Sequence, residues 1–334
     1  MLWFKRIIAL TVGLAAGASV LGGAAQAQDL NGAGGTFPGP IYQHWFQEYG
    51  AAHGIHINYQ LVGSGAGIKA ITAKTVDFGA SDAPMTEKDL AAAPGIMHIP
   101  TVAGPVCISY NIPGVGPGIR LTGQVIADIF MGKITKWDDP AITRLNPGTR
   151  FPGIGIQPAH RSDGSGTTNI FTTYLSDVSG EWNSNIGHGT AVRWPVGLGG
   201  KGNAGVAQLI KRTDGGIGYI ELSYAVTNDI PYALVRNKSG KFIYPNVEDT
   251  SIAVSGVTMP ADFRKVAVNT SNPKGYPITG FTFILVYRNS TKPAVKSLLE
   301  WCLTTGQKEA GALYYAPLPD NIRTRALAAV ASLR

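Results

Sequence analysis

A turn dense in hydrogen-bond donors runs from His160 to Asn169, with the sequence HRSDGSGTTN. The apolar stretch before it and the amphipathic pattern after it predict a sharp passage from a strand into a helix. The first N–H groups of a helix have no intrahelical partner and carry partial positive charge, which suits an oxyanion. Ser165 and Thr167 add hydroxyl donors, and the guanidinium of Arg161 is a planar fork that fits phosphate or carboxylate. The turn therefore has the composition of one half of an anion site.

Asp163 lies in the same turn and would repel an anion if it faced one. Its expected role is therefore to hold the guanidinium of Arg161 in place. A simpler interpretation is that the Ser, Asp and Thr residues only cap a helix and satisfy local backbone groups. Both interpretations stay open when this segment is considered alone.

Three further strand ends carry hydroxyls, glycines or an acid, around Thr36 with Phe37, around Ser64, and at Asp82. Each follows a strand pattern and precedes a helical one, and this repetition predicts a parallel sheet with ligands near the carboxyl ends of its strands. Each loop alone also has a simpler interpretation, because Thr36 and Ser64 could be helix caps and Asp82 could cap a turn. The convergence of four such strand ends favours a binding site.

Residues 1–27 have the pattern of a secretory signal, in which Lys5 and Arg6 precede an apolar stretch that ends in a small-x-small motif at Ala27. We expect cleavage after Ala27 and export of the remaining chain of about 300 residues, enough for two α/β lobes. Loss of Lys5 and Arg6 lowers the net charge from +7 by two, to +5. This mild, dispersed charge gives no reason to expect a nucleic-acid partner.

The sequence gives only weak support for a catalytic function or for a bound cofactor. The loop Gly199–Gly202 (GGKG) lacks the Ser or Thr that a nucleotide-binding loop needs after its lysine. The His, Asp and Ser of the 160–169 turn are too crowded for a catalytic triad, whose members come from separate elements. His53 and His56 have no evident third metal ligand. We therefore expect binding, with no catalytic residue, no cofactor and no metal site.

The two cysteines, Cys107 and Cys302, both lie in apolar patterns typical of a protein core. An exported protein meets an oxidising compartment, where a disulfide can form. Two cysteines far apart in sequence do not decide between a disulfide and two core thiols.

Six segments in this order carry a resemblance to a known family: Gly32–Pro38, Val76–Pro84, Gly132–Asp139, Arg161–Thr167, Trp194–Asn203 and Gly216–Tyr219. The chain resembles the periplasmic phosphate-binding proteins of high-affinity phosphate ABC importers, over nearly all of its mature length. The resemblance implies a periplasmic α/β protein of type II, with two lobes joined by a two-strand hinge. It further implies a monomer that closes on one inorganic phosphate ion and docks on the membrane permease of the importer.

The resemblance also implies the binding site. Its donors are hydroxyl and backbone N–H groups in both lobes, at Thr36, Phe37, Ser64, Ser165, Gly166 and Thr167. Asp82 accepts the proton of the bound phosphate, and Arg161, held by Asp163, pairs with the anion. Gly65 departs from the family pattern, which often has a second serine there. Relatives that bind tungstate, molybdate or sulfate share the architecture, so Asp82 and the Arg161 turn are what favour phosphate.

We expect the first lobe to comprise residues 28–110 and 282–334 and the second to comprise residues 111–281. Val106–Ile112 and Phe281–Tyr287 would be the strands that cross between them. Two other functions stay open at this stage, a secreted phosphatase and a binder of another tetrahedral oxyanion. We also expect Asp82 to exclude sulfate, which carries no proton for its carboxylate to accept.

Overall fold

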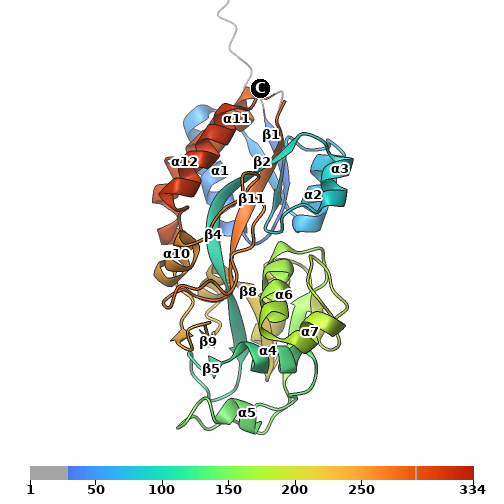
Figure 1. Cartoon of the computed structure of the whole chain (residues 1–334), viewed down its shortest axis with the longest axis vertical. Coiled ribbons are helices and arrows are strands. Elements are labelled where there is room, and N and C mark those ends of the chain that lie inside the picture. The colour runs from blue at the N-terminus through green and yellow to red at the C-terminus, as the bar shows by residue number, and fades with distance from the viewer. Residues whose placement is uncertain (1–28, 290–291) are drawn as a thin grey trace, which may run out of the picture.

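A computed structural model describes residues 29–289 and 292–334 and arranges them in two α/β lobes (Figure 1). The predicted signal peptide, residues 1–27, lies outside the described residues. Among the residues described, no helix combines the length and the apolar character needed to cross a membrane.

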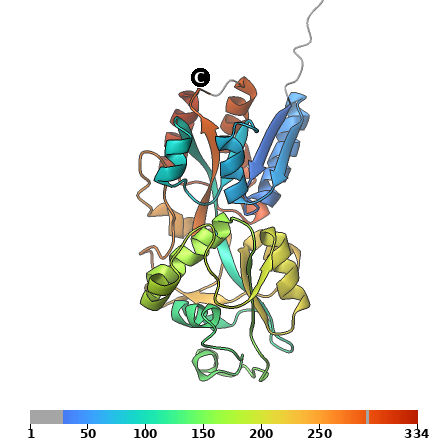
Figure 2. The same cartoon turned by 90° about the vertical axis from the view of Figure 1, so that its right-hand side faces the viewer.

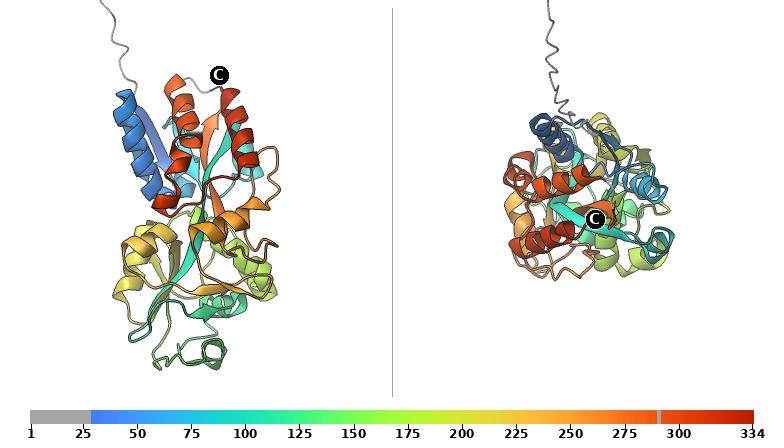
Figure 3. Two further views of the ribbon diagram at one scale, coloured as in Figure 1. Left: turned by 90° about the vertical axis from the view of Figure 1, so that its left-hand side faces the viewer. Right: turned by 90° about the horizontal axis from the view of Figure 1, so that it is seen from above.

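The first lobe is built on a mixed sheet in the order β2-β1-β3-β11-β4. Its strands are β1 (Leu30–Gly34), β2 (Ile57–Leu61), β3 (Phe78–Ser81), β4 (Ile96–Asn111) and β11 (Thr279–Tyr287). Strand β1 is parallel to β2 and β3, whereas β11 is antiparallel to β3 and β4. The helices around this sheet are α1 (Gly39–His53), α2 (Ser64–Thr72), α3 (Glu87–Ala92), α11 (Pro293–Leu303) and α12 (Asp320–Ala331) (Figure 3).

The second lobe continues the sheet from β4 in the order β8-β6-β7. These strands are β6 (Gln157–Arg161), β7 (Leu198–Gly200) and β8 (Gly216–Glu221). Its helices are α4 (Gly123–Phe130), α5 (Pro140–Thr143), α6 (Gly166–Val178), α7 (Gly180–Asn185), α8 (Gly202–Arg212) and α9 (Leu222–Thr227). Helices α6 and α8 lie just below the first lobe, so their N-termini are close to its loops (Figure 2).

The remaining elements complete the two lobes. A small sheet contains β5 (Arg120–Leu121), β9 (Leu234–Arg236) and β10 (Phe242–Ile243), and β9 and β10 form an antiparallel hairpin. The last elements are α10 (Val247–Ser255) and the short 3-10 helices η1 (Gly306–Lys308) and η2 (Gly311–Leu313).

Strand β4 belongs to both lobes. It pairs with β11 from Ile96 to Pro105 and with β8 from Val106 to Asn111, so its partner changes between Pro105 and Val106. The crossover strand expected at Val106–Ile112 is part of one longer continuous strand, Ile96–Asn111. Within residues 29–289 and 292–334, strand β11 pairs only with β3 and with this first part of β4, which differs from the crossover expected at Phe281–Tyr287. Apolar runs reveal that a strand is buried but not which strand lies beside it.

Both cysteines are buried, as their apolar surroundings predicted, and both are free thiols. Cys107 lies in β4 and Cys302 in α11. Burial raises the pKa of the Cys107 thiol well above its ordinary value, which makes it a poor nucleophile. The structure therefore uses both residues as core side chains.

Candidate anion-binding site

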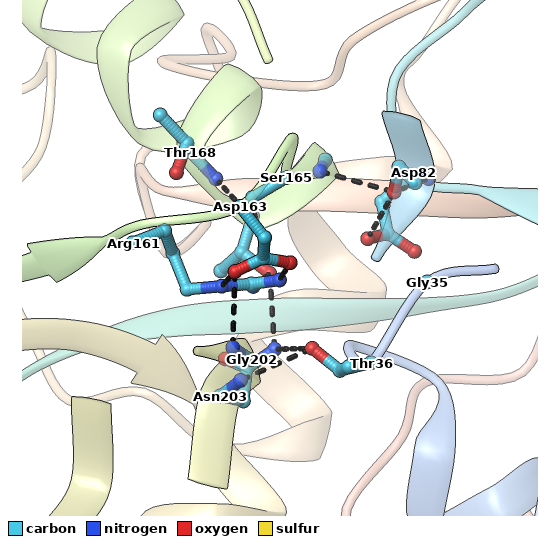
Figure 4. Close-up of polar contacts among 12 residues, drawn as sticks. Gly35, Thr36, Asp82, Arg161, Asp163, Ser165, Thr168, Gly202 and Asn203 are labelled. Carbon is cyan, nitrogen blue, oxygen red and sulfur yellow. Dashed lines mark hydrogen bonds and ion pairs between the residues drawn. The ribbon is translucent and has the colours of Figure 1, made fainter. Parts of the chain in front are cut away.

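The predicted site residues lie where the two lobes contact one another, and Figure 4 labels five of them, Thr36, Asp82, Arg161, Asp163 and Ser165. The N–H of Gly65 donates to the carbonyl of Gly164 at 2.9 Å. The N–H of Gly166 donates to Oγ of Ser64 at 3.0 Å, and the N–H of Asn203 donates to Oγ1 of Thr36 at 3.1 Å. Each of these bonds joins one lobe to the other, so the structure represents a closed arrangement.

Arg161 ends β6 and is only 4% exposed. Its Nε and Nη2 atoms donate to the two carboxylate oxygens of Asp163 at 2.8 and 2.5 Å, which is the pairing the sequence predicted for these residues. Burial alone would raise the pKa of Asp163, but the hydrogen bonds and charge of Arg161 hold it below its ordinary value. The carboxylate also accepts the N–H of Gly202 at 3.0 Å. Asp163 thus fixes the guanidinium while Nη1 donates to Oγ1 of Thr167 at 3.3 Å.

Asp82 follows β3 and is 2% exposed. Its Oδ1 accepts the hydroxyl of Thr282 at 2.8 Å, and its Oδ2 accepts the hydroxyl of Ser64 at 3.2 Å. Burial raises the pKa of Asp82 to about 6, against the opposing effects of the Thr282 hydrogen bond and the Arg161 charge. A buried carboxyl that titrates near neutrality and a fixed cation therefore share the same region.

Two glycines lie where the lobes meet, and at one of them, Gly166, there is no room for a side chain. A Cβ atom at position 166 would lie 2.5 Å from Cβ of Asp82, closer than real Cβ contacts allow. A Cβ atom at position 65 would lie 3.1 Å from Cα of Gly164, so a serine there would force one loop to shift by a few tenths of an ångström. The departure of Gly65 from the family pattern thus matches a close approach of two backbones.

The structure places all nine predicted residues in or next to the loops, strand ends and helix starts where the two lobes face one another. Through Asn203, one hydrogen-bonded group joins Thr36, Arg161, Asp163 and Thr167. A second group joins Ser64, Asp82 and Gly166. Ser165 caps α6 by accepting the N–H of Thr168 at 3.0 Å, and the carbonyl of Phe37 accepts the hydroxyl of Tyr315 at 2.7 Å.

Sequence reasoning missed several residues that support this region, among them Asn203, Thr282 and Tyr219. Asn203 connects the two lobes, Thr282 binds Asp82, and the hydroxyl of Tyr219 accepts the N–H of Arg161 at 3.0 Å. Thr282 and Tyr219 lie inside apolar strands, where a single polar group among buried neighbours was the available signal. Asn203 closes one of the motif segments, but a polar residue at a helix start usually signals a cap.

Two α/β lobes in mutual contact, with one strand shared between them and a buried cation and carboxyl at their interface, define a two-lobed solute-binding protein of type II. The model of the PBP superfamily domain matches residues 19–305. "Phosphate-binding protein PstS" of Xylella fastidiosa (strain Temecula1) is 43% identical over 300 residues, covering 88% of this chain and 82% of that protein. The protein of the same name from Pasteurella multocida is 41% identical over 304 residues, covering 89% and 88%. The chain therefore belongs to the family of the phosphate-binding proteins PstS.

Solved structures share the fold at lower sequence identity. A putative phosphate ABC transporter substrate-binding protein from Clostridium perfringens, solved with bound phosphate, aligns with a TM-score of 0.66. It is 18% identical, and the alignment covers 87% of this chain and all of that one. This likeness supports the two-lobed architecture independently of the sequence relatives.

Proposed function

We propose that this protein binds one inorganic phosphate ion between its lobes and delivers it to an ABC importer. The observation that carries the proposal is the placement of a fixed guanidinium and a buried carboxyl with a pKa of about 6 at one interface between lobes. Inorganic phosphate has one more acidic proton than a phosphate ester, whose second and last ionisation falls at about pH 6, so near neutral pH it is an anion that still carries a proton. It can therefore accept hydrogen bonds from Arg161 and also donate one to Asp82. Sulfate can only accept.

The proposed ligand groups follow from the same arrangement. Arg161, held by Asp163, compensates the charge of the ion, and Asp82 accepts its proton. The remaining donors are hydroxyl and backbone N–H groups of Thr36, Phe37, Ser64, Ser165, Gly166 and Thr167. Their burial strengthens each hydrogen bond to a charged ligand, because little water competes for it.

The wider assignments belong to the same proposal. The chain would be exported with a signal peptide cleaved after Ala27, act in the periplasm as a monomer, and dock on a membrane permease. It would bind without catalysing a reaction. The first lobe would comprise residues 28–110 and 282–334, and the second residues 111–281. Family membership and the coverage of relatives named for phosphate binding support these assignments.

Two measurements on the purified mature protein test the proposed function. Calorimetry should give phosphate binding with one ion per chain and no requirement for a metal or nucleotide. Incubation with a chromogenic phosphate ester should give no turnover above background. Turnover that disappears in Arg161→Ala would instead support a secreted phosphatase that uses the same residues.

A further inference from the structure

Asn203 is a fully buried residue at the start of α8, and it connects the two lobes. Its Nδ2 atom donates to Oγ1 of Thr36 at 2.9 Å and to Oγ1 of Thr167 at 3.1 Å. Figure 4 shows Asn203 facing Thr36 across the interface between the lobes. Its Oδ1 atom accepts the backbone N–H of Glu221 at 3.0 Å. Because a backbone N–H can only donate, this last bond fixes which end of the amide is oxygen and which is nitrogen.

The contacts of Asn203 determine where two hydroxyl protons can go. A threonine hydroxyl has one proton to donate and two lone pairs with which to accept. Oγ1 of Thr36 accepts from both the N–H and Nδ2 of Asn203, at 3.1 and 2.9 Å. Oγ1 of Thr167 accepts from Nδ2 of Asn203 and from Nη1 of Arg161, at 3.1 and 3.3 Å. Both lone pairs of each hydroxyl are therefore occupied, and each proton must be donated to another acceptor.

We propose that Asn203 is a positioning residue that turns the hydroxyl protons of Thr36 and Thr167 towards the bound anion. The proposal rests on the proposed phosphate function. Donors oriented in advance bind an anion more tightly, because their reorientation no longer opposes binding. One of the two hydroxyls comes from each lobe, and the bond to Thr36 joins the lobes. Asn203 thus completes the donor set only when the lobes close.

Asn203 should not distinguish between two oxyanions of the same shape that both retain a proton. Hydroxyl protons are donated equally well to oxygens of phosphate and of arsenate, another tetrahedral oxyanion that retains a proton. Loss of Asn203 should therefore lower the affinities for phosphate and for arsenate by similar factors. We expect Asn203→Ala to lower phosphate affinity roughly tenfold or more, since hydrogen bonds to a charged group are among the stronger ones.

Double-mutant cycles measured by phosphate calorimetry test whether Asn203 acts through the two hydroxyls. Asn203→Ala is combined with Thr36→Val and, separately, with Thr167→Val, because valine keeps the shape of threonine without its hydroxyl. Asn203→Ala should cost less affinity in each valine background than in the wild type, because its effect through one of the two hydroxyls is already lost there. Ser165→Ala provides the control cycle, because the Ser165 hydroxyl accepts from Thr168 and belongs to a different cap. Its effect should add to that of Asn203→Ala.

Additivity with either threonine, or equal non-additivity with Ser165, would overturn the proposal. If Asn203→Ala does not fold, Asn203→Asp keeps the side-chain shape and the acceptor for the Glu221 N–H but replaces the donor with an acceptor. Asn203→Asp should lower phosphate affinity more when Thr36 and Thr167 are present than when valine replaces them. Equal losses of affinity in the two backgrounds would overturn the proposal. Wild-type protein that binds no phosphate would refute the proposed function itself, whereas unchanged binding by Asn203→Ala would refute only the role of Asn203.

Discussion

At the scale of single residues, Asp82 is the group that distinguishes a protonated anion from an unprotonated one. Its two carboxylate oxygens already accept hydroxyls of Thr282 and Ser64, so the carboxylate is held in one orientation. Against sulfate, this buried carboxylate would face only lone pairs, which leaves two like charges desolvated and unpaired. Sites that require one hydrogen bond can reject an analogue that lacks it by roughly 10⁴ or more.

Asp82→Asn should therefore keep phosphate affinity within a modest factor and let sulfate compete. The amide can donate to a sulfate oxygen and carries no charge to repel it. Competition between sulfate and phosphate, measured for both proteins at one pH and salt concentration, checks this prediction. A variant that excludes sulfate as strictly as the wild type does would assign the discrimination to another residue.

The same carboxyl should make sulfate binding by the wild type depend on pH. The pKa of Asp82 is raised to about 6 by burial, so Asp82 becomes protonated as the pH falls through that value. A protonated carboxyl can donate, and sulfate should then bind at pH 5 but not at pH 8. Asp82→Asn should show no such change between these two pH values, and an equal change in both proteins would contradict the role of Asp82.

Glu221 should make the ligand-free protein less stable at high pH. It is fully buried at the end of β8, where its Oε2 atom accepts the Ser223 N–H at 3.0 Å and lies 3.0 Å from the hydroxyl oxygen of Tyr315. Burial raises its pKa to about 8, against the opposing hydrogen bonds. The folded state therefore holds this proton more tightly than the unfolded state, and stability is lost as the pH rises from about 4.5 to about 8.

Glu221→Gln replaces the titrating carboxyl with an amide that stays uncharged at every pH. It should raise the melting temperature at pH 8.5, with little change at pH 4. Thermal unfolding of both proteins without phosphate provides the measurement. Glu300→Gln is the matched control, because Glu300 is exposed on α11 and its substitution should leave the pH profile unaltered. A profile for Glu221→Gln that parallels the wild type would show that the residue titrates as it does in the unfolded chain.

At the scale of elements, α6 combines a structural cap with a proposed ligand. Ser165→Ala removes the acceptor for the Thr168 N–H and should lower the free energy of unfolding by about 1 kcal/mol. It should also weaken phosphate binding, since the hydroxyl is a proposed donor. Ser179 caps α7 in the same way, by accepting the N–H of Trp182 at 3.3 Å. Ser179→Ala should cost similar stability and leave phosphate affinity intact; equal losses of affinity would remove Ser165 from the site.

The elements that sequence could predict are those with a local signal. The strand–loop–helix units around Thr36, Ser64 and Arg161 show their periodicity and their glycines within a few residues. The role of Asn203 has no local signal, because Thr36 and Thr167 lie 167 and 36 positions away in the chain. The change of partner within β4 is hidden for a related reason, since both halves of that strand are equally buried.

At the scale of the whole molecule, the lobes touch through hydrogen bonds of their own as well as through any ligand. Besides the loop contacts, the hydroxyl of Tyr224 donates to the carbonyl of Thr36 at 2.6 Å. A phosphate ion bound by both lobes would add further contacts that exist only in the closed arrangement, and so favour closure. Small-angle scattering should show compaction when phosphate is added. Arg161→Ala should not compact at the same concentration, and a wild type of unchanged size would refute ligand-driven closure.

Calorimetric titration of the mature wild-type protein at pH 8, with phosphate and then with sulfate, gives the sharpest test of the binding role. At this pH Asp82 is ionised, and phosphate still carries the proton that its carboxylate accepts. We predict saturable phosphate binding with one ion per chain and no detectable sulfate binding. No heat with phosphate, or equal affinity for the two ions, would contradict a phosphate site built on Arg161 and Asp82.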